Sequence, residues 1–203
     1  MNVLQDLITA VLQVLVFSLI PFIWWLITAR KEVNFFHWIG LKKPRIENPR
    51  NFILALVLYL AGSLVLFWLL KVFLAELAGN ESVAANRFAG MGLSGLAPAL
   101  IYAFIQTGLA EEILIRGFLG KRLGNKFGFN AGNIIQALLF GLMHGVLFFA
   151  IVGPVKALII ILITGFVGWT LGYINEKQAG GSIVPSWLLH GLSNLISALA
   201  VMF

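Results

Sequence analysis

Long apolar segments alternate with short polar ones along nearly the whole chain. A helix needs about 20 mostly apolar residues to cross the hydrocarbon core of a bilayer, and six stretches meet this requirement. They are Val3–Ala29, Phe52–Ala78, Leu96–Leu119, Asn133–Val152, Val155–Ile174 and Val184–Phe203. The pattern predicts an all-α polytopic membrane protein with about six transmembrane helices, which form a single transmembrane domain over residues 1–203.

The composition agrees with this class. Hydrophobic residues make up 60% of the 203 residues, charged residues only 11%, and the mean hydropathy is +0.97. A soluble domain typically carries about 25% charged residues, so most of this surface is expected to face lipid. The chain has no cysteine, which excludes disulfides, thiolate metal ligands and cysteine nucleophiles.

The net charge of +6 arises from the loops. Basic residues are concentrated after the first, third and fifth spans and are sparse on the opposite side. The concentrated group is Arg30, Lys31, Lys42, Lys43, Arg45, Arg50, Lys121, Arg122, Lys126 and Lys177, and the sparse group is Lys71, Arg87 and Lys156. The positive-inside rule then predicts cytoplasmic basic loops and outward-facing termini. We therefore expect the lipid bilayer as the partner, and no nucleic acid.

Three of the expected spans carry polar side chains that a bilayer disfavours. Span three contains Glu111, Glu112 and Arg116, span four contains His144, and span six contains His190 and Asn194. From the helical rise, Glu111, His144 and His190 lie roughly 12, 16 and 9 Å from the cytoplasmic ends of their spans. Their similar depth predicts one polar cavity in the cytoplasmic half of the helix bundle.

Helical spacing gives the two glutamates different surroundings. Glu112 and Arg116 are four residues apart and share a helix face, which predicts a buried ion pair. Glu111 points about 100° away, so it is free to face the cavity and act as a general base. His190 and Asn194 also share a face, and an imidazole and an amide directed at one place suit a developing oxyanion.

The same residues form three motifs in a fixed order along the chain. They are Glu111-Glu112-x-x-x-Arg116, Phe140-x-x-x-His144 and His190-x-x-x-Asn194. With these motifs the chain resembles the CPBP intramembrane proteases, which include type II CAAX prenyl endopeptidases and Abi-like bacteriocin-processing and immunity proteins. The resemblance covers about residues 101–200, which would be the catalytic core.

The resemblance implies a glutamate-dependent endopeptidase that needs no cofactor and has no metal site. Glu111 and His144 would activate a water molecule, His190 and Asn194 would stabilise the tetrahedral oxyanion, and the ion pair would be structural. The substrate would be a lipidated or membrane-bound protein or peptide, prenylated in the CAAX case. The enzyme would be a multi-pass protein of the plasma membrane in a prokaryote, or of the endoplasmic reticulum in a eukaryote.

Other intramembrane proteases need different residues. The HExxH string of a zinc enzyme does not occur, and Asp6 is the only aspartate, so an aspartyl enzyme lacks its second acid. A rhomboid-like GxSG string surrounds Ser94, but this serine is expected at the outer end of span three, far from His190. Two alternatives stay open: a zinc-dependent metalloprotease with His144, His190 and Glu111 as ligands, and a non-catalytic immunity factor, scaffold or small transporter.

Overall fold

A computed structural model of the chain describes residues 2–73 and 75–203, with all their side chains except those of residues 65–67, 69–73 and 75. Every regular element in these residues is a helix. The α-helices are α1 (Val3–Thr28), α2 (Phe35–Trp38), α3 (Pro49–Phe73), α4 (Leu96–Leu100), α5 (Lys121–Phe127), α6 (Phe129–Tyr173) and α7 (Val184–Met202). Shorter elements are the 3₁₀ helices η1 (Ala75–Leu77), η2 (Ala84–Phe88) and η3 (Gly92–Gly95) and the π-helices η4 (Ile101–Leu109), η5 (Glu112–Gly120) and η6 (Ile174–Gln178). The predicted all-α class is confirmed.

Four helical stretches among the described residues are long and apolar enough to cross a membrane. They are Val3–Thr28, Gly92–Phe127, Phe129–Gln178 and Val184–Met202. The second expected span falls on α3, whose described apolar part, Pro49–Leu64, is shorter than a full span. Within that expected span, Leu74 and the side chain of Lys71 lie outside the described residues. The fourth and fifth expected spans both fall within Phe129–Gln178.

A reversal at Gly153 divides α6 into two arms, residues 129–152 and 154–173. Gly153 has φ 74° and ψ 175°, which glycine adopts without a steric penalty. The arms then run antiparallel and very close together: a Cβ atom built on Gly141 would lie 2.3 Å from the carbonyl oxygen of Ile161. The predicted break between the fourth and fifth spans is therefore at the expected place, although the first arm begins earlier, at Phe129.

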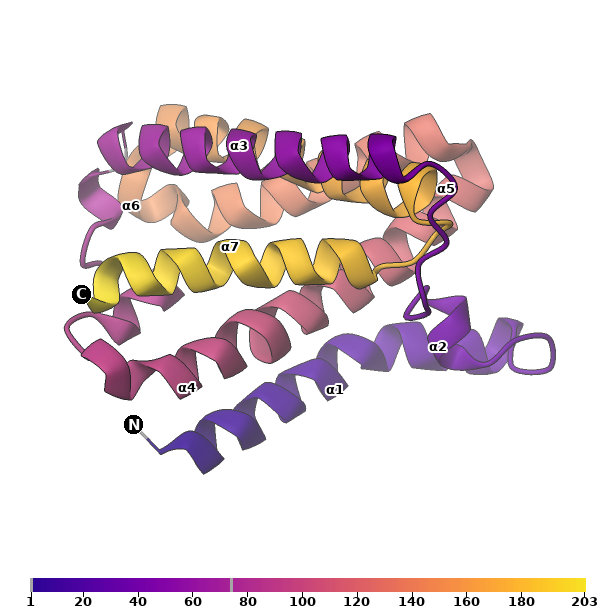
Figure 1. Cartoon of the computed structure of the whole chain (residues 1–203), viewed down its shortest axis with the longest axis horizontal. Coiled ribbons are helices and arrows are strands. Elements are labelled where there is room, and N and C mark those ends of the chain that lie inside the picture. Colours follow the sequence, from indigo (N-terminus) through magenta and orange to yellow (C-terminus); the bar gives the residue numbers. More distant parts are fainter. Residues whose placement is uncertain (1, 74) are drawn as a thin grey trace.

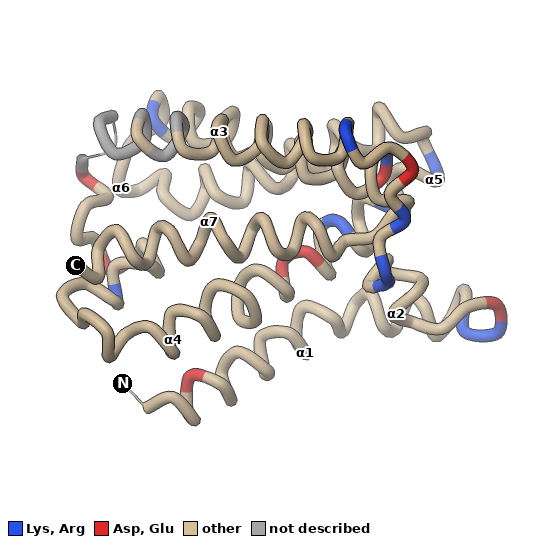
Figure 2. The backbone as a smooth tube through the Cα atoms, in the orientation of Figure 1, with Lys and Arg blue, Asp and Glu red and all other residues tan. Residues whose placement is uncertain are grey.

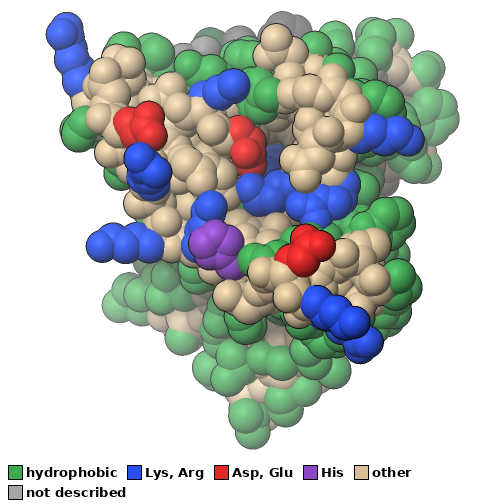
Figure 3. Space-filling view, turned by 90° about the vertical axis from the view of Figure 1, so that its right-hand side faces the viewer, with side chains coloured by type: hydrophobic (Ala, Val, Ile, Leu, Met, Phe, Trp, Pro, Cys, Tyr) green, Lys and Arg blue, Asp and Glu red, His purple; other side chains and the backbone are tan. Residues whose placement is uncertain are grey.

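The long helices lie side by side along the longest axis of the molecule (Figure 1). Both termini lie at one end, and α2 and α5 lie at the other. Lysine and arginine residues gather at the end that holds α2 and α5 (Figure 2), and a view onto this end shows them spread across it above apolar flanks (Figure 3). The basic loops that the sequence assigns to one side of a membrane thus share one end of the molecule.

Apolar side chains cover the outside of the molecule, whereas several polar ones are buried inside it. Leu15 and Leu147, for example, are 60% and 61% exposed. In a soluble protein, positions with this exposure usually carry polar side chains. Glu112, Gln136 and Ser186 are instead 0–1% exposed. A surface of this kind is stable in contact with lipid, which supports an integral membrane protein.

The helix that carries both glutamates differs from the expected α-helix. It consists largely of the π-helices η4 and η5, with Ala110 and Glu111 between them. π-Helical turns are wider, close i→i+5 hydrogen bonds and occur often at functional sites. The 100° rotation per residue that was used to orient Glu111 against Glu112 describes an α-helix, whereas most of this segment is π-helical.

Candidate active site

The structure brings the predicted polar residues of three helices together, with Glu112 at the centre. Glu112 is completely buried. Its Oε1 atom lies 3.1 Å from Nη1 of Arg116 and 3.0 Å from Nδ1 of His190, and its Oε2 atom accepts a hydrogen bond from the hydroxyl of Ser186. The expected ion pair is present, but Glu112 also binds two groups of α7, so it links two helices.

Arg116 is packed as closely as its partner. It is 3% exposed, and its guanidinium carbon lies 4.1 Å from the centre of the Phe140 ring. A Cβ atom on Gly168, in the second arm of α6, would lie 3.3 Å from Nη2 of Arg116. Glycine at this position therefore leaves room for the guanidinium between the two arms of α6 and η5.

Glu111 faces the other side of His190. Its Oε2 atom lies 3.8 Å from Nε2 of His190 and finds no hydrogen-bond partner among the described residues. A separation of 3.8 Å is too long for a direct hydrogen bond but suits two groups that share a water molecule. His190 thus lies between the two glutamates, with one ring nitrogen directed at each.

His144 has a defined orientation on the first arm of α6. Its Nδ1 atom lies 2.9 Å from the carbonyl oxygen of Phe140. Because a carbonyl oxygen only accepts, Nδ1 carries the proton, and Nε2 of the neutral ring is left with its lone pair. The ring also packs on Phe140, with ring centres 4.5 Å apart, and Phe140 meets His190 edge-on at 6.0 Å.

A cavity of about 450 Å³ opens beside these residues. His144, His190 and Asn194 line it together with Phe140 and mainly apolar side chains of α3, the second arm of α6 and α7. Neither glutamate lines the cavity. The two histidines and the asparagine therefore border a largely apolar space, while Glu111 reaches the site through its contact with His190.

Asn194 has a partner that the sequence did not indicate. Its amide nitrogen donates a hydrogen bond to the hydroxyl of Thr107 at 2.8 Å, and that hydroxyl donates to the carbonyl oxygen of Tyr102 at 2.9 Å. One of the two amide hydrogens of Asn194 remains for a ligand in the cavity. Thr107 fixes the amide plane, which an oxyanion donor requires.

Ser186 and Asn175 are further members of the site that the sequence reasoning missed. The amide of Asn175 donates to the hydroxyl of Ser186 at 2.7 Å, and both side chains are buried. A signal was present, because Ser186 precedes His190 by four residues and shares its face of α7. Tyr59 of α3 was missed as well; its hydroxyl lies 3.2 Å from that of Ser193, on the cavity wall.

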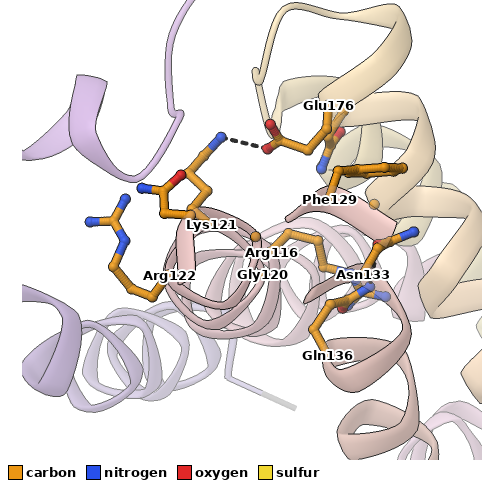
Figure 4. Close-up of a pocket in the computed structure, with 12 residues that line it drawn as sticks. Arg116, Gly120, Lys121, Arg122, Phe129, Asn133, Gln136 and Glu176 are labelled. Carbon is orange, nitrogen blue, oxygen red and sulfur yellow. Dashed lines mark hydrogen bonds and ion pairs between the residues drawn. The ribbon is translucent and has the colours of Figure 1, made fainter. Parts of the chain in front are cut away.

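A second, smaller pocket of about 210 Å³ lies at the basic end of the molecule. Figure 4 shows Arg116 extending toward Asn133 and Gln136 in this pocket, while Lys121 turns toward Glu176. The Lys121 and Glu176 side chains form an ion pair at 2.7 Å. Arg116 therefore separates the active-site cluster from a polar pocket that faces the basic end.

The described residues give no support to a zinc enzyme or to a rhomboid-like serine enzyme. In the described part of the chain, no three side chains of the metal-binding types lie close enough together to hold an ion, so the zinc hypothesis lacks a ligand set. Ser94, the serine of the rhomboid-like string, lies exposed in η3 and donates to the carbonyl oxygen of Met91. Ser94 shows no contact with a histidine among the described hydrogen bonds.

Comparison with protein families gives a match over half of the chain. The model of a family described as type II CAAX prenyl endopeptidase Rce1-like matches residues 93–196, which is more than half of the chain. Searches of curated proteins and of solved structures found nothing that matches. The matched segment contains both glutamates, Arg116, both histidines of the site and Asn194.

Proposed function

We propose that this chain, which belongs to the type II CAAX prenyl endopeptidase Rce1-like family, is an intramembrane endopeptidase in which Glu111 is the general base. The observation that carries the proposal is the position of Glu111, whose buried Oε2 atom has no hydrogen-bond partner among the described residues and faces Nε2 of His190 at 3.8 Å. A carboxylate buried inside a membrane protein is costly and typically marks a functional site.

The membrane arrangement of the proposal has six spans. They are α1, α3, the helix Gly92–Phe127, the two arms of α6, and α7. The reversal at Gly153 and the common location of both termini support this number. With the basic end in the cytoplasm, the site lies in the cytoplasmic half of an integral, multi-pass protein of the plasma membrane or the endoplasmic reticulum.

In the proposed reaction, Glu111 takes a proton from a water molecule that the lone pair of His144 helps to orient. The water oxygen bonds to the carbonyl carbon of the substrate, and the former carbonyl oxygen becomes an oxyanion. His190 and the free amide hydrogen of Asn194 donate to this oxyanion. When the carbon–nitrogen bond breaks, Glu111 returns the proton to the leaving amine, so that the products are a carboxylic acid and an amine.

The proposed substrate is a lipidated or membrane-bound protein or peptide, with a CAAX-type prenylated terminus as the first candidate. The cavity supports this choice because its volume of about 450 Å³ is lined mainly by apolar side chains, such as Leu64 and Val167, next to the two histidines. An isoprenyl chain gains free energy on entering such a space, and it would hold the adjacent peptide bond near the polar cluster.

The proposal can be tested with the purified protein in liposomes and a reporter peptide. The peptide carries a farnesylated cysteine that is followed by three C-terminal residues. The wild type should release the tripeptide, and Glu111→Gln should lower kcat by about a hundredfold or more, the range of a general base. Glu47→Gln, which removes an exposed glutamate of a basic loop, is the matched control. Equal cleavage rates for the wild type and Glu111→Gln would refute the assignment of the base, whereas no cleavage by the wild type would support a non-catalytic membrane protein.

A further inference from the structure

A continuous chain of buried hydrogen bonds leads from η6 through α7 to His190. We infer, on the basis of the proposed function, that Asn175 and Ser186 are positioning residues which act on His190 through Glu112. They hold Glu112 as an ionised acceptor, and Glu112 in turn fixes which nitrogen of the His190 ring faces the reacting groups.

The direction of each bond in this chain follows from its donors. The backbone N–H of Ser186 donates to Oδ1 of Asn175 at 3.3 Å, which assigns the oxygen end of that amide. The nitrogen end then donates to Oγ of Ser186 at 2.7 Å. Since Oγ accepts from Asn175, the hydroxyl proton of Ser186 is free to be donated onward.

Two acceptors compete for that proton. The carbonyl oxygen of Ile183 lies 3.0 Å from Oγ of Ser186, and Oε2 of Glu112 is closer. A carboxylate is also the stronger acceptor, because charge-assisted hydrogen bonds are about twice as strong as neutral ones. The hydroxyl therefore donates to Glu112, and both oxygens of Glu112 then act as acceptors.

An ionised Glu112 determines the tautomer of His190. Nδ1 of His190 lies 3.0 Å from Oε1 of Glu112, and only a protonated Nδ1 makes a hydrogen bond there. Nε2 is then the nitrogen left to face Glu111. In the doubly protonated ring, Glu112 balances the positive charge, and Nε2–H is the donor available to an oxyanion.

The residues of this hydrogen-bond chain are buried, so they can only position His190. Asn175 is 1% exposed, and Ser186 and Glu112 are 0% exposed, so none of them can touch a substrate in the cavity. Without Ser186, Oε2 of Glu112 would have no donor among the described residues, and the carboxylate could rotate away from Nδ1. His190 would then no longer be limited to one tautomer.

The first test measures the ring itself and does not need activity. Protein labelled with ¹⁵N in its histidine rings is studied by NMR in detergent micelles, with the signals of His190 assigned from a His190→Gln sample. The wild type should show the Nδ1-protonated or doubly protonated ring. Ser186→Ala should give a mixture of tautomers, and Ser186→Thr, which keeps a hydroxyl, should restore the wild-type signals.

The matched control is Ser182→Ala. Ser182 is also a fully buried serine, two residues before α7, but it donates to the carbonyl oxygen of Lys42 and accepts from the N–H of Val184. This variant should lose stability and keep the His190 signals of the wild type. If Ser186→Ala keeps those signals too, the hydrogen bonds from Asn175 to Glu112 are merely structural and the inference is wrong.

The second test uses the reporter peptide. Ser186→Ala should lower kcat by about ten- to a hundredfold, the worth of one charge-assisted hydrogen bond, and leave KM within about twofold. An equal change in kcat for Ser182→Ala, or a change of Ser186→Ala confined to KM, would overturn the inference. Failure of the proposed function has a separate signature, because then the wild type itself would not cleave the peptide while the NMR result would stand.

Discussion

Replacing Glu112 with glutamine preserves the shape of the side chain but removes the negative charge that faces Arg116. The two groups lie 3.1 Å apart, with side-chain exposures of 0% and 2%. The variant therefore leaves a guanidinium buried without a counter-charge at contact distance. Breaking a buried ion pair by removing one partner costs about 3–5 kcal/mol, and we expect the free energy of unfolding to fall by about that amount.

A second ion pair of the molecule provides the control. Glu176 and Lys121 approach even more closely, at 2.7 Å, but the Glu176 side chain is 37% exposed at the basic end. Water and salt screen such a pair, so Glu176→Gln should lower the free energy of unfolding by only about 0–1 kcal/mol. The comparison separates the effect of burial from the effect of distance.

A double variant tests the cause of the loss. Glu112→Gln combined with Arg116→Met removes the uncompensated charge and fills its space with an apolar side chain. Replacing both partners of a buried pair in this way is often neutral or stabilising, so most of the lost stability should return although activity should not.

Unfolding can be followed by titrating SDS into mixed micelles and recording tryptophan fluorescence and helical circular dichroism together. The reasoning predicts that Glu112→Gln loses much more stability than Glu176→Gln and that the double variant recovers. A loss in Glu112→Gln no larger than that of Glu176→Gln would refute it, because burial would then have no measurable effect on the pair.

Three further predictions address catalysis, packing and metal dependence. His190→Ala should lower kcat by about a hundredfold or more with little change in KM, as for a lost oxyanion donor, and steady-state kinetics on the reporter peptide would measure both. Gly141→Ala should destabilise the protein, since its Cβ would lie 2.3 Å from the carbonyl oxygen of Ile161. A Cβ on Gly62 would meet no atom within 4 Å among the described residues outside its own stretch of helix, so Gly62→Ala should be neutral or stabilising by up to about 1 kcal/mol in the same SDS titration. Dialysis against EDTA should leave the rate unchanged with substoichiometric zinc by mass spectrometry, and a rate restored only by added zinc would contradict a metal-independent site.

The sequence predicted the features that depend on single segments. Apolar length located the helices, and the boundary between the spans expected at residues 133–152 and 155–174 coincides with the break at Gly153. The cost of charge in a membrane singled out Glu111, Glu112 and Arg116, and the ion pair at 3.1 Å agrees with the spacing argument. The roles of these residues in a reaction remain predictions.

The features that were missed depend on how helices face one another. Ser186 was overlooked because a serine in a membrane helix commonly bonds to its own backbone, and only the rotation of α7 toward η5 directs it to Glu112. The link from Asn194 to Thr107 arises in the same way, between α7 and η4. The helices η4 and η5 are π-helical, and an apolar pattern alone does not distinguish a π-helix from an α-helix.

The surroundings of the two adjacent glutamates suggest why one site needs both. With His190 doubly protonated, Arg116 and His190 would balance the negative charges of Glu111 and Glu112, and the cluster would be neutral. When Glu111 accepts the proton of water, its negative charge disappears as the oxyanion forms on the other side of the same reaction. The cluster and the oxyanion together remain neutral. The negative charge has moved from Glu111 to the oxyanion, which faces Nε2–H of His190. Because no net charge would be created in a medium where charge is costly, this arrangement would lower the barrier of the proposed reaction. It also explains the loss expected for His190→Ala, in which the oxyanion would form with no cation facing it.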